Sequence, residues 1–280
     1  KDNGKGDEED EEEGDESDED DSYAGVYINN VFGSSTVAFL ENTISNNSGQ
    51  GVYVCGEGEC SSSALIFEDN TIKDNNGSGL KVYELFTSTL SVLRNTINGN
   101  GGNGSDDQNA GLELWYVGAG EDGEDSLVSS VTVGKNTLDG NYYGIYINAT
   151  DGNAEITIGK DNIIKNNSNA GIYLRSSVSG VTIDGNTIQN NGVESETTGI
   201  VVLSASGNEA HENIIAGNGS HGVSNEDEHG NIFDAKQNWW GDVTGPLHDP
   251  ENPGGDGNAV SDNITFVPWY VNFGRTILSS

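Results

Sequence analysis

The triplet Asn-Thr-Ile returns along this chain at nearly even intervals, and such a repeat restricts the possible folds more than any other feature. The triplets, and close variants that end in Thr-Leu or Ile-Ile, begin at Asn42, Asn70, Asn95, Asn136, Asn162, Asn186 and Asn213, so the successive spacings are 28, 25, 41, 26, 24 and 27 residues. A period of roughly 20 to 50 residues is typical of solenoids, propellers and repeat arrays.

Each repeat also contains short runs that alternate apolar and polar residues, such as 171–174 and 181–183, separated by turns rich in Asn and Gly. Runs of this length with β-branched and aromatic residues predict strands. One turn of two or three short strands cannot bury its apolar side, whereas stacked turns bury a continuous column. The sequence therefore predicts an all-β chain, a single parallel β-helix of about 8–9 coils stacked roughly 4.8 Å apart.

The Asn-Thr-Ile and Gly-Ile-Tyr elements, over residues 22–271, resemble the repeats of secreted and surface right-handed parallel β-helix proteins of archaea and bacteria, in the pectate-lyase-like superfamily. The resemblance implies the right-handed coil and leaves activity open, because this fold hosts many functions. We expect the repeated asparagines to occupy corners, with left-handed backbone, and to pair their amides between coils.

The 41-residue spacing between Asn95 and Asn136 contains two polar stretches, 99–109 and 118–125, that predict inserted loops. Loops that project from a regular scaffold are common carriers of function. Four carboxylates of the second loop are candidate cation ligands, with a solvated acidic loop as the alternative: Glu121, Asp122, Glu124 and Asp125.

The predicted domain limits are an acidic segment (1–21), the β-helix (22–237) and a closing region (238–280). The closing region contains Asn-Trp-Trp-Gly, Gly-Pro and Pro-Trp elements, and these resemble the closing block of many secreted β-helix proteins. The resemblance implies a capping coil in which Trp239, Trp240 and Trp269 cover the last apolar layer. A platform on which sugars stack is the alternative.

The acidic segment holds 13 carboxylates between Asp7 and Asp21. Such a run repels itself, and ordering it would need counter-charge. Ca²⁺, which prefers several carboxylate oxygens, is the expected cofactor. A neighbouring chain or simple solvation are the alternatives. The candidate ligands in this segment are Asp15, Glu16, Asp18, Glu19, Asp20 and Asp21.

The net charge of −35 argues against nucleic acids and anionic membranes as partners and suits a salty or calcium-rich medium. There is no apolar run of about 20 residues for membrane insertion, and a start at Lys1 fits a processed secreted chain. Cys55 and Cys60 favour a disulfide over a metal pair, which fits an extracellular location. Glycosylation sequons begin at Asn46, Asn76, Asn103, Asn148, Asn166, Asn218 and Asn263.

An enzymatic site is hard to assemble from this sequence. Lyases of similar fold use Ca²⁺ beside an Arg or Lys base, and this chain has only three arginines, Arg94, Arg175 and Arg275, with eight lysines scattered along it. Hydrolases flank the glycosidic bond with carboxylates roughly 5–10 Å apart, whereas the Asp106-Asp107 pair lies in an inserted loop, several coils from His221 and His229.

These observations favour an extracellular structural or surface protein over an enzyme. We expect it to be stabilised by Ca²⁺ and to assemble with itself, either end to end into a filament or surface layer or by exchange of its N-terminal arm. The alternative is a polysaccharide-active enzyme of lyase, hydrolase or epimerase type, or a carbohydrate-binding module.

Overall fold

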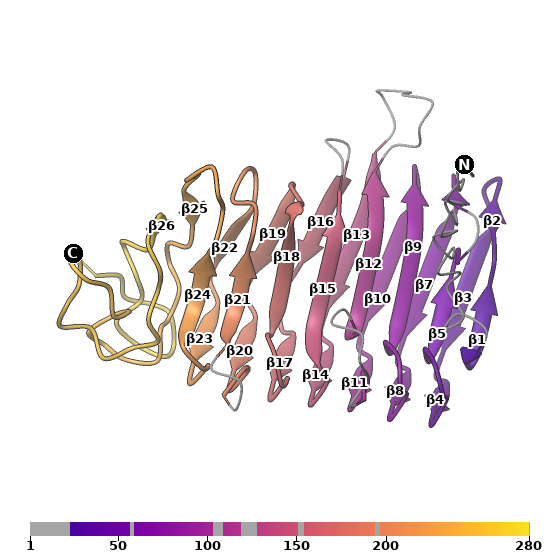
Figure 1. Cartoon of the computed structure of the whole chain (residues 1–280), viewed down its shortest axis with the longest axis horizontal. Helices are drawn as coiled ribbons and strands as arrows, with labels where there is room; N and C mark the ends of the chain where they lie inside the picture. The colour runs from indigo at the N-terminus through magenta and orange to yellow at the C-terminus, as the bar shows by residue number, and fades with distance from the viewer. Residues whose placement is uncertain are drawn as a thin grey trace, which may run out of the picture.

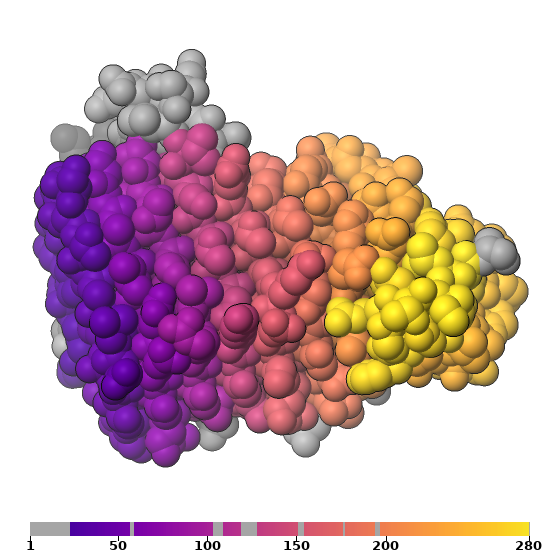
Figure 2. All heavy atoms as spheres, turned by 180° about the vertical axis from the view of Figure 1, so that it is seen from behind, coloured from indigo at the N-terminus to yellow at the C-terminus, as the bar shows by residue number. Residues whose placement is uncertain are grey.

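The computed structural model describes residues 23–56, 59–102, 109–118, 128–150, 154–193 and 197–279. These residues form an elongated all-β stack in which successive coils follow one another along the long axis (Figure 1). The colour runs in chain order from one end to the other when the molecule is seen from behind (Figure 2). None of the described residues forms a helix long and apolar enough to cross a membrane.

Three parallel sheets run along the stack, and eight strands follow one another on the main path of the first. Sheet A contains β1 (Val26–Ile28), β2 (Val31–Phe32), β5 (Val52–Val54), β6 (Cys60–Ser61), β9 (Leu80–Phe86), β12 (Ala110–Gly118), β15 (Tyr143–Ala149), β18 (Ile172–Ser177), β21 (Thr198–Val202) and β24 (His221–Asn225).

The other two sheets complete each coil. Sheet B contains β3 (Thr36–Leu40), β7 (Ala64–Glu68), β10 (Thr89–Leu93), β13 (Ser129–Gly134), β16 (Ala154–Ile158), β19 (Val181–Asp184), β22 (Glu209–His211), β25 (Phe233–Asp234) and β26 (Ile264–Thr265). Sheet C contains β4 (Thr43–Ser45), β8 (Thr71–Lys73), β11 (Thr96–Asn98), β14 (Thr137–Asp139), β17 (Ile163–Lys165), β20 (Thr187–Gln189) and β23 (Ile214–Ala216). The predicted all-β parallel β-helix is confirmed.

The repeated triplet forms sheet C, where equivalent residues of successive coils pair directly. Thr96 of β11 pairs with Thr71 of β8 on one side and with Thr137 of β14 on the other. The register therefore continues unchanged across the 41-residue spacing.

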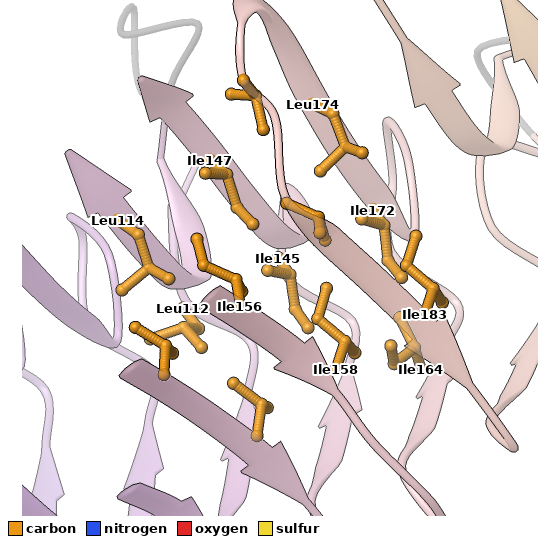
Figure 3. Close-up of a cluster of buried hydrophobic side chains, with 14 of the residues drawn as sticks. Leu112, Leu114, Ile145, Ile147, Ile156, Ile158, Ile164, Ile172, Leu174 and Ile183 are labelled. Atoms are coloured by element: carbon orange, nitrogen blue, oxygen red, sulfur yellow. The ribbon is translucent and has the colours of Figure 1, made fainter. Parts of the chain in front are cut away.

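The core is a column of aliphatic side chains between the three sheets (Figure 3). Ile145 of sheet A, Ile158 of sheet B and Ile164 of sheet C all face this column and are fully buried. Because side chains alternate along a strand, each short strand contributes only one to three residues to it. Each buried Ile or Leu stabilises the fold by about 1.5–3 kcal/mol relative to an exposed one.

A continuous ladder of asparagines links the coils at the start of sheet C, as predicted. The backbone N–H and the side-chain Nδ2 of Asn70 both donate to Oδ1 of Asn95, each at 2.9 Å. Nδ2 of Asn70 also donates to the Phe39 carbonyl of the preceding coil. The ladder runs through Asn42, Asn70, Asn95, Asn136, Asn162, Asn186, Asn213 and Asn238.

A second asparagine ladder, which the repeat did not predict, lies after sheet C. Nδ2 of Asn100 donates to Oδ1 of Asn141 at 3.0 Å and to the Ile72 carbonyl at 3.1 Å. Its members are Asn47, Asn75, Asn100, Asn141, Asn167, Asn191, Asn218 and Asn258. Two rows of buried amides, one on each side of sheet C, therefore fix how the coils stack.

The expectation that the triplet asparagines themselves take left-handed backbone is wrong. The residue before each of them does so instead, as at Arg94, with φ 57°, and Lys135, with φ 59°. The corner bends there, and the following Asn turns its amide inward, where both of its polar atoms find partners. The left-handed corner residues are Glu41, Asp69, Arg94, Lys135, Asp161, Gly185, Glu212 and Gln237.

A column of glycines at the start of the sheet A strands leaves room for the second ladder. A Cβ added to Gly144 would collide with the Gly171 carbonyl oxygen and lie 2.7 Å from Cγ2 of Ile164. The same crowding recurs at Gly51, Gly79, Gly111, Gly171 and Gly199. Backbone of the next coil approaches too closely at these positions for any side chain.

The two ends of the described stack differ. At the N-terminal end, β1, β3 and β4 have a partner strand on one side only, and the core residues of this first layer are only partly buried, as at Phe39. At the C-terminal end, β26 continues sheet B, and Trp240 and Phe266 are fully buried against the core. Trp269 is half-buried beside them.

Cys55 and Cys60 form a disulfide with a Cα–Cα distance of 5.7 Å, which confirms the predicted pairing. β5 and β6 both pair with β9, so they are two parts of one strand interrupted by a loop. The disulfide closes that loop, and both cysteines are buried in the core.

Candidate functional site

The outer surface of sheet A from β9 to β18 carries a cluster of aromatic and charged side chains, here called the aromatic face. Strand alternation turns every second residue of these strands outward. The register aligns Lys81 with Glu113, Glu113 with Tyr146 and Tyr146 with Tyr173 across four strands. The face comprises Lys81, Tyr83, Glu113, Trp115, Tyr116, Tyr146, Asn148, Tyr173 and Arg175.

A buried carboxylate, Glu113, lies at the centre of this face and is only 2% exposed. Its Oε1 accepts a hydrogen bond from the Trp115 indole N–H and lies 3.7 Å from the Lys81 ammonium. Its Oε2 accepts a hydrogen bond from the Ser78 hydroxyl. Burial raises the pKa of Glu113 above the ordinary value, and the Lys81 charge and these hydrogen bonds oppose that rise.

Three aromatic rings pack together above this carboxylate. The rings of Tyr83 and Trp115 stack with centroids 5.8 Å apart, and Tyr116 meets Tyr83 edge-on at 5.5 Å. The Lys81 ammonium lies 5.5 Å from the Trp115 ring centroid, within the range of a cation–π interaction. Tyr116 is 43% exposed, so this part of the face presents ring surface to solvent.

A second group of rings continues the face on β15 and β18. Tyr146 and Tyr173 stack with centroids 5.4 Å apart, and Arg175 Nη1 donates to Oδ1 of Asn148 at 2.9 Å. Burial raises the pKa of Tyr146 to about 12, although the nearby Arg175 charge and hydrogen bond act in the opposite direction. The Tyr146 phenol is therefore neutral and hydrogen-bonding at any physiological pH.

The three arginines considered as catalytic bases lie in different places. Arg94 is paired with Glu68 and Asp69 at the corner after sheet B, and Arg275 donates to the Glu212 carbonyl near the C-terminal end. Only Arg175 belongs to the aromatic face, and it has no carboxylate partner among the described residues.

The proposed calcium ligands fall outside the described ranges. This applies to both sets, the one in the acidic segment (Asp15, Glu16, Asp18, Glu19, Asp20 and Asp21) and the one in the inserted loop (Glu121, Asp122, Glu124 and Asp125). Within the residues that are described, no group of three or more His, Cys, Asp or Glu side chains could hold a metal ion.

The predicted capping tryptophans occupy different environments. Trp240 is fully buried, Trp269 is half-buried against the core cluster, and Trp239 is half-buried with its backbone bridged to Ile214. None of the three belongs to the aromatic face.

The glycosylation sequons fall into two groups. Asn148 and Asn218 are buried, and their amides are hydrogen-bonded to Arg175 and to the second ladder respectively. In Asn218 the atom that would carry a glycan, Nδ2, donates to Oδ1 of Asn258, whereas in Asn148 it is Oδ1 that accepts from Arg175. Four others are exposed, namely Asn46, Asn76, Asn166 and Asn263, while Asn103 lies outside the described ranges.

Sequence reasoning missed the aromatic face because it treated the Gly-Ile-Tyr runs as strand markers only. The signal was present in the alternation itself. Lys81-Val82-Tyr83 and Glu113-Leu114-Trp115 each place an aliphatic residue between two outward residues. Comparing the outward residues of successive repeats would have placed Lys81 beside Glu113.

The coil geometry agrees with comparisons to known proteins. The family model described as right handed beta helix region matches residues 19–118 and 123–239, which together cover most of the chain. No curated protein and no solved structure matches the chain significantly. The stacked parallel sheets, the asparagine ladders and this match lead to one conclusion: the chain belongs to the right-handed β-helix family.

Proposed function

We propose that this chain is an extracellular, non-catalytic surface protein that binds polysaccharide on its aromatic face. The observation that carries the proposal is the row of aromatic rings and hydrogen-bonding groups aligned across β9, β12, β15 and β18. Aromatic rings offer a broad apolar surface, and the phenol, indole and amide groups beside them supply directed hydrogen bonds. A saccharide presents both kinds of surface, apolar C–H groups and hydroxyls.

A binding role fits this face better than bond cleavage. Hydrolysis needs two carboxyl groups on either side of the glycosidic bond, whereas Glu113 is enclosed and already occupied by Lys81, Ser78 and Trp115. A lyase of similar fold would use an Arg or Lys base, whereas on this face Lys81 is held by Glu113 between two rings and Arg175 donates to the Asn148 amide. An extracellular location is supported by the disulfide, since such bonds persist in oxidising compartments.

The proposal is tested by titrating the protein with a panel of neutral and anionic polysaccharides and following tryptophan fluorescence and calorimetry. Trp115→Ala should weaken binding by roughly tenfold or more, because a central aromatic residue carries much of the affinity of such a surface. Trp239→Ala is the matched control, since it removes a half-buried indole far from this face. Equal affinities of the two variants, or no binding to any polysaccharide, would contradict the proposal.

A second candidate function is self-assembly stabilised by Ca²⁺, and the first layer of the described strands favours the assembly part of it. The described strands β1, β3 and β4 each have an unpaired edge, and Phe39 is only partly covered. The opposite end is covered by Trp240 and Phe266. Two copies that meet through their N-terminal ends would therefore form a closed dimer, whereas a filament would need contacts at both ends of each copy.

This second candidate is tested by light scattering and electron microscopy of the full chain and of a variant lacking residues 1–21, in Ca²⁺ and in chelator. Dimers or longer assemblies that form only in Ca²⁺ and only with the acidic segment are the expected result. Monomers under all four conditions would count against assembly.

A further inference from the structure

Glu113 makes three side-chain contacts that join two neighbouring coils. Trp115 belongs to its own strand, β12, while Ser78 precedes β9 and Lys81 lies within β9. The Ser78 hydroxyl also accepts a hydrogen bond from the backbone N–H of Ala110 at 2.9 Å. One carboxylate therefore determines where the indole and the ammonium lie relative to each other.

The same carboxylate also balances the charge of Lys81. The Lys81 side chain is 17% exposed and lies between the rings of Tyr53 and Trp115, with its ammonium 5.0 Å and 5.5 Å from their centroids. In so enclosed a site an ion pair is screened much less than at an open surface. To a ligand above the rings, the Lys81–Glu113 pair therefore presents little net charge.

We infer that Glu113 is a positioning and specificity-determining residue, which orients Trp115 and Lys81 and makes this part of the aromatic face select uncharged over anionic saccharides. This inference rests on the proposed function. The remainder of the protein acts in the same direction, because a net charge of −35 repels polyanions. Arg175, on a strand three places from that of Lys81 in sheet A, is the other cation of the face and donates to the neutral Asn148 amide.

Glu113→Gln tests this inference because it keeps the shape of the side chain and removes its charge. We expect affinity for a neutral glucan to fall roughly tenfold, since hydrogen bonds to a charged acceptor are lost. Affinity for polygalacturonate should rise by a similar factor, because the Lys81 charge is no longer balanced. Both are measured by calorimetry at low salt, where exposed charges are least screened.

Glu209→Gln is the matched control, because it makes the same change in net charge at a half-buried carboxylate on sheet B. The double variant Glu113→Gln with Lys81→Gln should lose the gain for polygalacturonate. A gain that persists there would assign anion binding to Arg175 or another cation and overturn the inference. So would equal selectivity of Glu113→Gln and Glu209→Gln.

A readout without saccharide keeps the inference separate from the proposed function. In the NMR spectrum the indole N–H resonance of Trp115, identified by its loss in Trp115→Phe, should shift in Glu113→Gln and stay unchanged in Glu209→Gln. If this shift occurs and no polysaccharide binds, the positioning role stands and the specificity role fails with the proposed function. If wild type binds polysaccharide and the resonance does not move, the positioning role is wrong.

Discussion

Sheet C and the outer face of sheet A belong to the same coils, but residue types stay nearly constant from coil to coil in sheet C and change on the outer face of sheet A. In sheet C the first two positions of each strand recur in one register, Thr or Ile followed by Ile or Leu, between two rows of asparagines. On the aromatic face the paired residues change from one coil to the next, from Lys81 to Glu113, Tyr146 and Tyr173. The constant positions hold the coils together, and the variable ones are free to form a site.

The largest expected effect on stability concerns the asparagine ladder beside sheet C. Asn136→Leu would leave the backbone N–H of Asn95 without its acceptor, the Asn95 Nδ2 with only the Phe67 and Leu93 carbonyls, and the Val92 carbonyl without the Asn136 donor. Buried polar groups left unpaired cost about 1–3 kcal/mol each, so we expect a loss of roughly 3–5 kcal/mol in the free energy of unfolding, measured by chemical denaturation.

The control for this prediction is Asn42→Leu, at the exposed end of the same ladder, which receives no donor from a preceding described coil. It should cost less than about 1 kcal/mol. Equal losses for the two variants would mean that the ladder does not contribute through its buried hydrogen bonds.

A smaller effect is expected where backbone crowds the corner between sheets C and A. Gly144→Ala would place a methyl group against the Gly171 carbonyl oxygen and 2.7 Å from Cγ2 of Ile164, and such overpacking costs about 1–3 kcal/mol. Thermal denaturation measures the loss. Gly254→Ala is the control, because no atom lies within 4 Å of the added Cβ; a comparable drop in Tm there would show that the loss is not due to crowding.

The smallest effect concerns the aromatic face and is a dependence of stability on pH. Because the pKa of Glu113 is raised in the folded state, its protonation stabilises the fold fully below the unfolded Glu pKa of about 4.3. That contribution is lost as the pH rises through the higher folded pKa, and it amounts to about 1.4 kcal/mol for each pH unit between the unfolded and folded pKa values. Unfolding measured from pH 4 to 8 should show this dependence in wild type and not in Glu113→Gln. Parallel profiles would contradict it.

The difference between these regions also explains how much could be predicted from the sequence. The triplet predicted the fold because its Asn supplies the ladder and its Ile the core at a nearly constant period, as at Asn95 and Ile97. Asn75 and Asn100 were missed because Asn is common in turns for other reasons, and nothing local marks an inward amide. The Lys81–Glu113 pair was missed because it joins residues 32 positions apart in sequence, across a coil of irregular length.

The side-chain hydrogen bonds of the asparagine ladders all run in the same direction along the stack. Within each rung the side-chain carbonyl accepts from the coil before it, so the oxygens of both rows point toward the N-terminal end. Asn238, at the C-terminal end of the first row, donates its amide hydrogens to the carbonyls of Ala210, Ala235 and Lys236. Within the described residues, Asn42 and Asn47, the first members of the two rows, therefore present their side-chain carbonyl oxygens at the N-terminal end of the stack.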